Sequence, residues 1–489
     1  MERIEKTVER WCSTDFAFEG PAEGNPFLDV RLEATFTSGS REVSVPGFYD
    51  GDGHYVIRFM PDVPGTWHWH THSNRKELDG RTGAFSCVPA SGGNHGPVRI
   101  ASSRRFAYED GTPYHPFGTT CYAWTHQGDA MEERTLQSLE ASPFNKIRMC
   151  VFPKHYTFNT NEPELYPFEG HPDTGWDTTR FNPAFFRHLE KRIADLATRG
   201  IEADLILFHP YDRWGFATLG AEADDRYLRY IVARLAAYRN VWWSFANEYD
   251  LMRSKTLVDW ERMAALVADA DPWQRLRSIH HCFHSYDHTR PWITHCSIQR
   301  TDWYKTAEYV DEWRARYRKP VVVDECAYEG DIPNNWGNIT AEEMVRRFWE
   351  GTIRGGYVGH GETYWNPEEV LWWSKGGELH GGSPARIAFL RRLVEADFDE
   401  TMDYVPDGSA SDRNPPYFGR RSRYYLCYFG FNQPAWKMFE MPAGERYDVD
   451  VIDTWNMTVE NVEGAHEGTF RVDLPARPYM AVRLRRIQP

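Results

Sequence analysis

Two glutamates stand directly after strongly hydrophobic segments of the sequence. Glu248 ends VWWSFANE (241–248), and Glu325 ends VVVDE (321–325). Two carboxyl groups held close together in a partly dry pocket repel each other and lose solvation, so the pKa of one rises while the other stays ionised. Enzymes that cleave glycosidic bonds use such a pair, one carboxylic acid and one carboxylate. A separation of ~5 Å between them favours retention of configuration, and roughly 6.5–9.5 Å favours inversion.

The elements that must position these glutamates are short apolar segments that alternate with amphipathic helical segments. Eight candidate strands are FGTTCYAW, FNKIRMCVF, ADLILFHP, VWWSFANE, LRSIHHC, WITHCSIQ, VVVDECAY and YVGHGETY. Helical segments are predicted over 182–200, 224–240, 259–270, 306–319 and 340–355. Asn182, Asp224 and Thr340 are their candidate N-caps. This alternation predicts an α/β fold, a (β/α)8 TIM barrel over 99–395, in which only a short linker separates the fifth and sixth strands.

The two ends of the chain show period-2 alternation instead, which predicts a β-sandwich over 1–98 and a second one over 396–489. SASDRNPP (409–416) is the candidate flexible loop. In the first sandwich His68, His70 and His72 share one strand face, which formally permits a metal site. The alternative is a polar strand face opposite Trp67 and Trp69. No carboxylate or cysteine signal accompanies the histidines, so we predict no metal and no cofactor.

Composition narrows the class of ligand. The chain of 489 residues has a net charge of −15 with scattered Lys and Arg, which argues against nucleic acid or an anionic membrane as partner. Its 20 Trp and 26 Tyr suit the apolar faces of sugars, although packing in sandwich cores is an alternative explanation. MERIEKTVERW contains no apolar signal segment, and the eight cysteines show no paired spacing, so a cytoplasmic protein with reduced thiols is expected.

The sequence as a whole resembles the apiosidase-like glycoside hydrolases of clan A. The resemblance rests on GFYDGDGHYVIRFMP, on FAYEDGTPYHPFGTTCYAW at the start of the barrel, and on LILFHPYDRWGF, RNVWWSFANEYDL, RPWITHCSIQ and KPVVVDECAYEG. It implies that Glu248 is the acid/base, that Glu325 is the nucleophile, and that Asn247 donates a hydrogen bond to the sugar hydroxyl beside the anomeric carbon. It also makes a terminal pentofuranose, apiose or arabinofuranose, the first candidate substrate.

Other residues near the strand ends are candidates for contact with the substrate, because active sites of barrels lie at the C-terminal ends of their strands. Arg148 could keep the nucleophile ionised, or could form a structural ion pair. Asp324 should point away from Glu325 on the same strand and support it from behind. The candidate substrate-binding residues are Asn247, Arg148, His209, Trp124, Tyr211, His295, Gln299, Glu362, Tyr364 and Trp365.

We therefore expect a metal-independent, retaining, exo-acting glycoside hydrolase whose partner is a small glycoside or oligosaccharide. A hexopyranosidase, a transglycosidase and a metal-dependent sugar enzyme are alternatives within the enzymes. A carbohydrate-binding protein that has lost catalysis is an alternative of another class, whose signature would be a missing carboxylate; both are present. Large glycosidases of the cell interior often assemble, which keeps a homo-oligomer among the candidate states.

Overall fold

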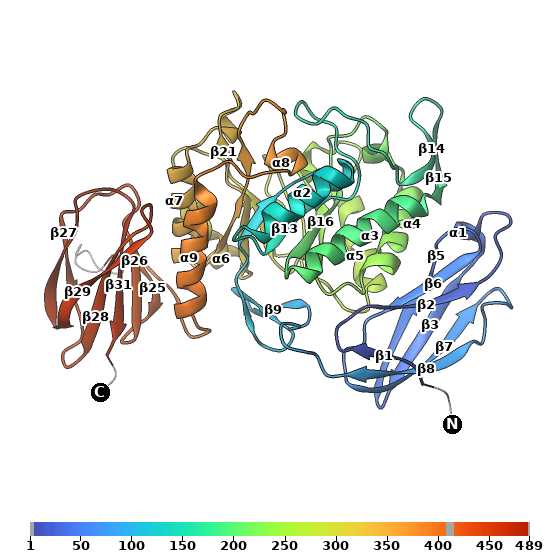
Figure 1. Cartoon of the computed structure of the whole chain (residues 1–489), viewed down its shortest axis with the longest axis horizontal. Helices are drawn as coiled ribbons and strands as arrows, with labels where there is room; N and C mark the ends of the chain where they lie inside the picture. Colours follow the sequence, from blue (N-terminus) through green and yellow to red (C-terminus); the bar gives the residue numbers. More distant parts are fainter. Residues whose placement is uncertain (1–3, 407–414, 488–489) are drawn as a thin grey trace.

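The computed structural model describes residues 4–406 and 415–487, which form a central barrel with a β-sheet unit at either side (Figure 1). In the N-terminal unit, a five-stranded sheet packs on a three-stranded one. The first sheet has the order β1 (Ile4–Glu9), β8 (Thr82–Val88), β7 (Gly65–Ser73), β3 (Leu32–Ser38) and β4 (Arg41–Pro46). The second has the order β2 (Thr14–Glu19), β6 (His54–Phe59) and β5 (Phe48–Tyr49). Phe36 of one sheet stacks on Phe59 of the other, with ring centroids 3.9 Å apart, so a sandwich core is present as predicted.

The barrel contains all eight predicted strands, and the ladders that join them are parallel. Their order is β18 (Arg277–Ser278), β17 (Val241–Ala246), β16 (Glu202–Phe208), β13 (Lys146–Cys150), β12 (Gly118–Thr120), β22 (Tyr357–His360), β20 (Val321–Glu325) and β19 (Cys296–Gln299). The fifth and sixth strands, β18 and β19, are the two ends of this sheet. The backbone N–H of Thr294 donates to the carbonyl of Arg277 at 2.9 Å and bridges this gap, so the barrel is nearly closed.

Helices form the outer layer of the barrel. They are α2 (Asp129–Glu140), α3 (Pro183–Thr198), α4 (Ala221–Leu235), α5 (Leu257–Ala270), α6 (Val310–Tyr317), α7 (Ala341–Ile353) and α9 (Ser383–Asp397). Asn182 and Thr340 cap α3 and α7 with their side chains, as predicted. The predicted cap Asp224 is wrong. Helix α4 begins at Ala221, and Asp224 lies in its first turn, where its buried carboxylate pairs with Lys255 at 2.5 Å.

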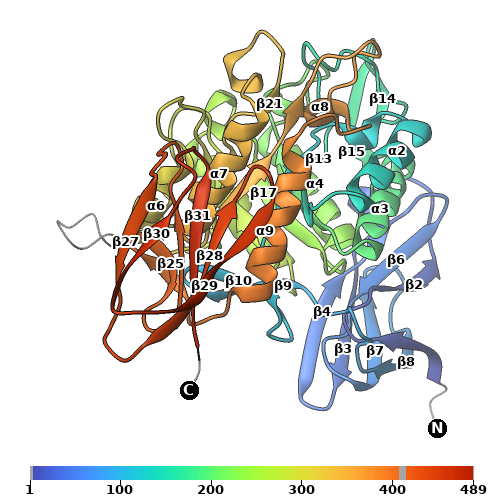
Figure 2. The same cartoon turned by 60° about the vertical axis from the view of Figure 1, so that its left-hand side comes forward.

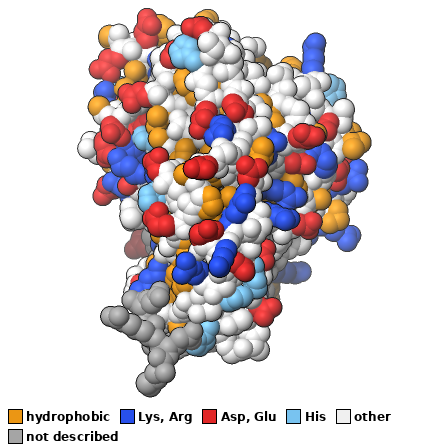
Figure 3. Space-filling view, turned by 90° about the vertical axis from the view of Figure 1, so that its right-hand side faces the viewer, with side chains coloured by type: hydrophobic (Ala, Val, Ile, Leu, Met, Phe, Trp, Pro, Cys, Tyr) orange, Lys and Arg blue, Asp and Glu red, His pale blue; other side chains and the backbone are white. Residues whose placement is uncertain are grey.

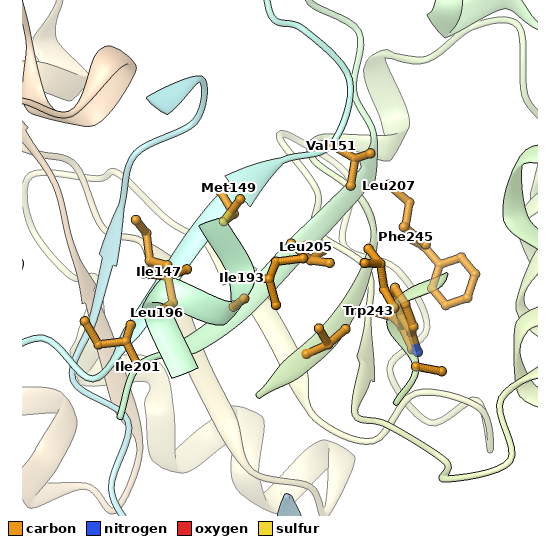
Figure 4. Close-up of a cluster of buried hydrophobic side chains, with 14 of the residues drawn as sticks. Ile147, Met149, Val151, Ile193, Leu196, Ile201, Leu205, Leu207, Trp243 and Phe245 are labelled. Carbon is orange, nitrogen blue, oxygen red and sulfur yellow. The ribbon is translucent and has the colours of Figure 1, made fainter. Parts of the chain in front are cut away.

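The barrel strands are buried on both faces, and alternate residues serve the two faces. Ile147 and Met149 of β13 and Leu205 of β16 pack with Ile193 and Leu196 of α3 outside the barrel (Figure 4). The residues between them, such as Lys146, Arg148 and Asp204, therefore point to the barrel interior. The apolar packing between strands and helices on the outside of the barrel thus fixes the strands that carry the polar side chains of the interior.

A small sheet closes the N-terminal end of the barrel. It is made of β9 (Val98–Ser102), β10 (Arg105–Tyr108) and β11 (Pro113–Tyr114). Phe106 of β10 contacts the ring of Trp242 with centroids 5.3 Å apart. Tyr114 joins the same buried cluster. The open end of the barrel is consequently the C-terminal end, where the strand endings meet.

The C-terminal unit packs on α7 and α9 (Figure 2). Its six-stranded sheet has the order β24 (Asp403–Val405), β25 (Tyr417–Arg420), β26 (Tyr424–Tyr428), β31 (Met480–Arg486), β28 (Arg446–Asp453) and β29 (Thr458–Glu467). A two-stranded sheet of β27 (Trp436–Glu440) and β30 (Thr469–Asp473) accompanies it. Tyr428 lies 5.3 Å from Trp349 of α7 between ring centroids, so the contact is aromatic. The loop predicted over 409–416 lies, apart from its last two residues, outside the described residues.

Charged side chains of both signs are interleaved on the face shown in Figure 3, with no broad region of a single sign among the coloured residues. Such a surface offers no long basic stripe of the kind that nucleic acids need. Over residues 4–406 and 415–487, none of the helices has the length and apolar character required to cross a bilayer.

Candidate active site

Glu248 stands just beyond the end of β17 in a strained backbone conformation. Its φ and ψ are 53° and 57°, the left-handed region that a residue with a Cβ enters at a cost of roughly 1–2 kcal/mol. The neighbouring backbone is fixed to the fifth strand, because the N–H of Tyr249 donates to the carbonyl of His280 at 2.9 Å. The Glu248 side chain is only 5% exposed. The strand ending therefore turns sharply and holds a carboxyl group in a nearly dry place.

Glu325 is the last residue of β20 and reaches the same end of the barrel through an irregularity in the strand pairing. Ile298 pairs with Val323, but Gln299 pairs with Glu325, so Asp324 is the extra residue of a bulge. Simple alternation predicts opposite directions for Asp324 and Glu325. The bulge changes this: Asp324 bonds to Lys146 inside the barrel at 3.0 Å, while Glu325 lines the cavity at the barrel mouth.

Three donors surround the carboxylate of Glu325. The Tyr122 hydroxyl donates to its Oε1, Arg148 Nη1 lies 3.2 Å from the same oxygen, and His280 Nε2 lies 3.3 Å from it. Burial raises the pKa of Glu325. Three neighbours lower it more: His280 by its hydrogen bond and charge, Arg148 by its charge, and Tyr122 by its hydroxyl. The pKa of Glu325 therefore lies below its ordinary value. Glu325 is therefore held as a carboxylate, the form that a nucleophile needs.

The pKa of Glu248 is shifted in the opposite direction. Burial raises its pKa, and the negative charge of Glu325 raises it further. The Tyr211 hydroxyl donates to its Oε2 and offsets part of this effect. The pKa values of the two carboxyl groups of one cavity are thus shifted apart, which makes Glu248 the better proton donor and Glu325 the better carboxylate.

A chain of buried polar groups continues from Glu325 into the barrel. His280 Nδ1 lies 2.9 Å from Ser297 Oγ, and Ser297 donates to Asp324 at 2.5 Å. Lys146 lies 3.0 Å from Asp324 and 2.6 Å from Asp204. All of these side chains are buried. The nucleophile is consequently connected to the middle of the fold, and its orientation depends on that network.

The cavity at this end has a volume of about 320 Å³, at the lower end of the usual range for small-molecule sites. Side chains from most strand endings form its wall. They are Tyr122, Lys154, Tyr156, Tyr211, Asn247, Glu248, Leu251, Cys282, Phe283, Gln299, Thr301, Glu325, Tyr328, Trp336 and Trp373. Both glutamates therefore face one space that is rich in aromatic rings, as a sugar-binding pocket requires.

Four of the predicted substrate-binding residues take part in this arrangement. Asn247, Tyr211 and Gln299 line the cavity, and Arg148 lies behind the nucleophile. The Asn247 Oδ1 accepts from Arg148 Nη1 at 2.8 Å and lies 3.1 Å from the oxygen of the Tyr122 hydroxyl. This fixes the orientation of the amide and leaves its N–H groups as donors, the role that the resemblance implies for Asn247.

The other six predicted contacts require correction, because these side chains do not line the cavity: Trp124, His209, His295, Glu362, Tyr364 and Trp365. Trp124 is fully buried, with its Nε1 directed at the sulfur of Met149. His209 bonds to the carbonyl of Phe152 at 3.1 Å, and burial lowers its pKa to about 3. Both side chains support the fold at the rim rather than contact the pocket.

The other four side chains lie outside the cavity for local reasons. His295 lies before β19 rather than after it, so it packs against Phe106 at the closed end of the barrel, with ring centroids 5.5 Å apart. Glu362 accepts from the backbone N–H groups of His380, at 2.5 Å, and Gly381, at 2.8 Å, and so anchors the segment that precedes α9. The Tyr364 hydroxyl donates to Glu329 at 3.0 Å, and Trp365 is 51% exposed outside the pocket.

Several wall residues were not among the predicted contacts. Tyr122 is one of them, and His280, which lies behind the wall beside Glu325, was likewise not predicted. Lys154 lies on the loop after β13, and Trp373 lies in the one-turn helix α8 (Trp372–Lys375), where periodicity gives no signal. The nearest sequence clue to Lys154 was its position directly after the second strand, in the motif FPKHY.

Two side-chain clusters among the described residues could formally hold a metal ion: Asp129 with Glu132 and His188, and Glu329 with His360 and Glu362. The first is occupied by the guanidinium of Arg192, which bonds to Glu132 at 2.5 Å and to Asp129 at 2.6 Å. In the second, the carboxylate of Glu329 accepts from backbone N–H groups at the start of α9. On β7, His70 Nδ1 lies 3.3 Å from His72 Nε2, and the three strand histidines are not one of these clusters.

The comparisons with known proteins agree with this geometry. The model of the apiosidase-like catalytic domain matches residues 101–387, which contain both glutamates and every residue of the cavity wall. The chain belongs to the apiosidase-like family. Two further family models, both described as domains of unknown function (DUF5060 and DUF5605), match residues 7–74 and 414–485 of this family member.

Solved structures extend the comparison to the whole chain. A "putative glycoside hydrolase" from Bacteroides vulgatus shares 40% identity, with 99% of this chain and 100% of that chain covered and a TM-score of 0.94. A glycoside hydrolase family 5 protein, also from Bacteroides vulgatus, shares 14% identity over 80% of this chain and 94% of that chain, with a TM-score of 0.61, and shows the fold alone. A search of curated proteins gives no match. This apiosidase-like protein is therefore an enzyme of the glycoside hydrolase class.

Proposed function

We propose that this enzyme is a retaining, exo-acting glycoside hydrolase that works by double displacement. The observation that carries the proposal is the placement of Glu248 and Glu325 on one cavity, each with its own donors, which shift the pKa of Glu248 upward and that of Glu325 downward together with burial and charge. Glu325 attacks the anomeric carbon while Glu248 gives its proton to the leaving oxygen. Glu248 then takes a proton from water, which attacks the same carbon and releases Glu325.

Other contacts supply what these steps need. Arg148 and His280 lie within 3.3 Å of the attacking carboxylate and hold it ionised and oriented. Asn247 presents amide N–H donors beside both glutamates, where a sugar hydroxyl next to the anomeric carbon would bind. The enclosed aromatic wall favours removal of a terminal sugar over binding along a polymer. A pentofuranose, apiose or arabinofuranose, is the first candidate because of the family, and the substrate is a small glycoside or oligosaccharide.

The test compares Glu248→Gln and Glu325→Gln on two aryl glycosides of one sugar, with a poor and a good leaving group. A panel of furanosides and pyranosides first identifies the sugar. A good leaving group needs little protonation, so Glu248→Gln should lose at least about 100-fold in kcat/KM on the poor one and much less on the good one. Glu325→Gln should lose activity on both, because nucleophilic attack is required in each case.

Stereochemistry gives a second readout. NMR of the first-formed sugar should show the anomer of the substrate, as double displacement requires. Glu222→Gln, an exposed position at the start of α4, is the matched control and should behave as the wild type. Formation of the opposite anomer would disprove the nucleophilic role of Glu325, and full activity of both variants would disprove the hydrolase mechanism at this cavity.

A further inference from the structure

A second cavity lies at the closed end of the barrel, away from the end that holds Glu248 and Glu325. Its wall comes from β9–β11, from α7 and α9 and from β25, and Figure 2 shows β9 and β10 next to α9 and the C-terminal unit. The cavity has a volume of about 200 Å³ and shares no lining residue with the cavity of the two glutamates. Because a cavity of about 150 Å³ in a protein core can hold benzene, this one has room for an aromatic ring with a small substituent.

Three pairs of packed aromatic rings border this second cavity. Small residues lie among them: Ala101 and Ala107 line the cavity, and a Cβ added to Gly111 would meet no atom within 4 Å outside its chain neighbours. Aromatic rings pack on one another through their faces and edges, so such a wall suits a flat apolar molecule. The pairs are Phe117 with Phe348, Phe398 with Phe418, and Phe106 with Tyr357, with ring centroids 6.4 Å, 4.1 Å and 5.4 Å apart.

Arg314 of α6 brings a buried hydrogen-bond donor to this wall. Only 5% of Arg314 is exposed. Its Nη1 donates to the carbonyl of Arg354 at 2.7 Å, and its Nη2 donates to Asp403 at 2.5 Å. Its Nε, in contrast, has no hydrogen-bond partner within residues 4–406 and 415–487. Buried donors of folded proteins are nearly always paired, so this N–H indicates a place for an acceptor at the wall.

Arg105 and His115 carry further donors on the wall. Arg105 Nη1 donates to the carbonyl of Asp399 at 2.7 Å, and no described carboxylate forms a salt bridge with Arg105. The ring of His115 makes no hydrogen bond to a described residue, and its centroid lies 6.3 Å from that of the Phe398 ring. Burial, and the charges of Arg105 and Arg391, lower the pKa of His115 to about 4. The ring is therefore neutral near pH 7 and keeps one N–H donor.

The charged side chains of the wall balance one another. Arg105 and Arg314 are its cations, and Asp399 and Glu400 are its anions. A ligand with a net charge would disturb this balance in a partly buried place, where uncompensated charge is costly. The wall therefore favours a neutral molecule, and its donors favour one that has an acceptor.

We propose that this cavity is a second binding site, which takes a small neutral molecule made of one aromatic ring and a hydrogen-bond acceptor. The inference goes beyond the proposed hydrolase function and does not depend on it. The ring would lie among the three aromatic pairs, and the acceptor would meet the donors of Arg105, Arg314 and His115. Because the wall comes from the barrel and from the C-terminal unit, a bound molecule would also stabilise their junction.

The experiment titrates the wild type with five probes in ligand-observed NMR. Benzamide has the ring and a neutral acceptor, and its Kd should be on the order of 1 mM. Toluene lacks the acceptor and should bind about 2- to 10-fold more weakly. Acetamide lacks the ring, and protonated benzylamine has a charge but no acceptor, so both should bind at least about 10-fold more weakly. Benzoate should bind no more tightly than benzamide, and benzamide at about 10 mM should raise the midpoint of thermal unfolding.

Variants assign the binding to this cavity. Thr352→Phe on α7 and Ala107→Leu on β10 fill the space from two sides, and each should weaken benzamide binding at least about 10-fold. His115→Phe keeps a ring but removes its nitrogens, so the preference for benzamide over toluene should shrink. Phe283→Ala is the matched control, because it removes an exposed ring from the wall of the other cavity and should leave the Kd of benzamide unchanged. Thermal unfolding shows whether each variant keeps the fold.

A crystal of the wild type soaked in benzamide adds a readout that needs no variant. The ring should lie between the Phe117 and Phe398 side chains, with its carbonyl toward Arg105, Arg314 or His115. Absence of saturable binding, binding that both filling variants leave unchanged, or a ring found only beside Glu248 and Glu325 would overturn the proposal. Equal affinity for benzamide, benzoate and protonated benzylamine would overturn the assigned ligand class.

Discussion

Replacing His280 by glutamine should move the acid limb of the pH–rate profile. His280 Nδ1 lies 2.9 Å from Ser297 Oγ, and Ser297 uses its proton to donate to Asp324, so Nδ1 must donate. His280 Nε2 faces two acceptors, Glu325 Oε1 at 3.3 Å and Gln299 Oε1 at 3.1 Å. Both ring nitrogens of His280 therefore face oxygen atoms, and the ring joins Glu325 to Ser297.

The size of the effect follows from the contact that is lost. A hydrogen bond to a charged group, here the Glu325 carboxylate, contributes about 1.5–3 kcal/mol. A difference of about 1.4 kcal/mol corresponds to one pH unit in the titration of a carboxyl group. Because the nucleophile must be ionised to attack, His280→Gln should move the acid limb of kcat/KM upward by roughly 1 to 2 pH units. Above that limb the loss of rate should be smaller, since Glu325 is again a carboxylate.

The assay is kcat/KM between pH 3 and pH 9 on the best aryl glycoside of the panel, for the wild type, His280→Gln and His281→Gln. His281 is the matched control because it is the next residue and is also buried, yet in the described structure it donates to neither glutamate. Thermal unfolding of each variant shows whether the fold is kept. A profile that falls evenly at every pH, with the acid limb in its original place, would refute the role of His280 in holding Glu325 ionised.

Further changes test other parts of the structure. Tyr211→Phe removes the donor that lowers the pKa of Glu248, so the alkaline limb of kcat/KM should move to higher pH. Tyr156→Phe is the control. An alkaline limb that stays in place or moves to lower pH would contradict the role of Glu248 as the acid. Glu202 at the start of β16 accepts from Trp242 at 2.8 Å, and burial raises its pKa to about 7 from an ordinary value of 4.5. The native state therefore holds this proton more tightly, and the resulting stability, roughly 3 kcal/mol, is present below about pH 4.5 and lost as pH rises through about 7. Urea unfolding at pH 5 and pH 8 should show a smaller pH dependence for Glu202→Gln, and an unchanged one would contradict the argument. Dialysis against EDTA should leave kcat/KM unaltered. Arg192 already occupies one acidic cluster, and backbone N–H groups bind the carboxylates of the other. Activity that is lost on dialysis and restored by a divalent ion would show that a metal is needed.

Periodicity predicted the scaffold because burial on both faces leaves a strong pattern in the sequence. Segments such as ADLILF and VWWSFA are apolar throughout, as expected for strands inside a layer of helices. The fifth strand is only Arg277–Ser278, and no helix lies between it and the sixth over residues 279–295. The connection between the two strands is longer than the predicted short linker, because β18 and β19 are both shorter than their predicted segments.

Alternation along a strand fails where the backbone departs from a regular ladder, and the site contains such departures. The bulge at Asp324 places consecutive carboxylates in the barrel interior and at its mouth, which a period of two cannot predict. The left-handed turn at Glu248 has a similar effect. A loop brings Lys154 to the cavity and the short helix α8 brings Trp373, and the approach of both depends on tertiary packing around the Tyr122 ring.

The contacts inside the barrel explain why the nucleophile depends on a histidine beside it. Arg148 and Lys146 are cations of this network, and Asp204, Asp324 and Glu325 are its carboxylates. Buried charges of this kind are costly unless partners compensate them. His280 touches the network at both Ser297 and Glu325 and so joins the nucleophile to the interior. Loss of His280 should therefore favour protonation of a carboxylate, and Glu325 is the one that gives up a direct contact.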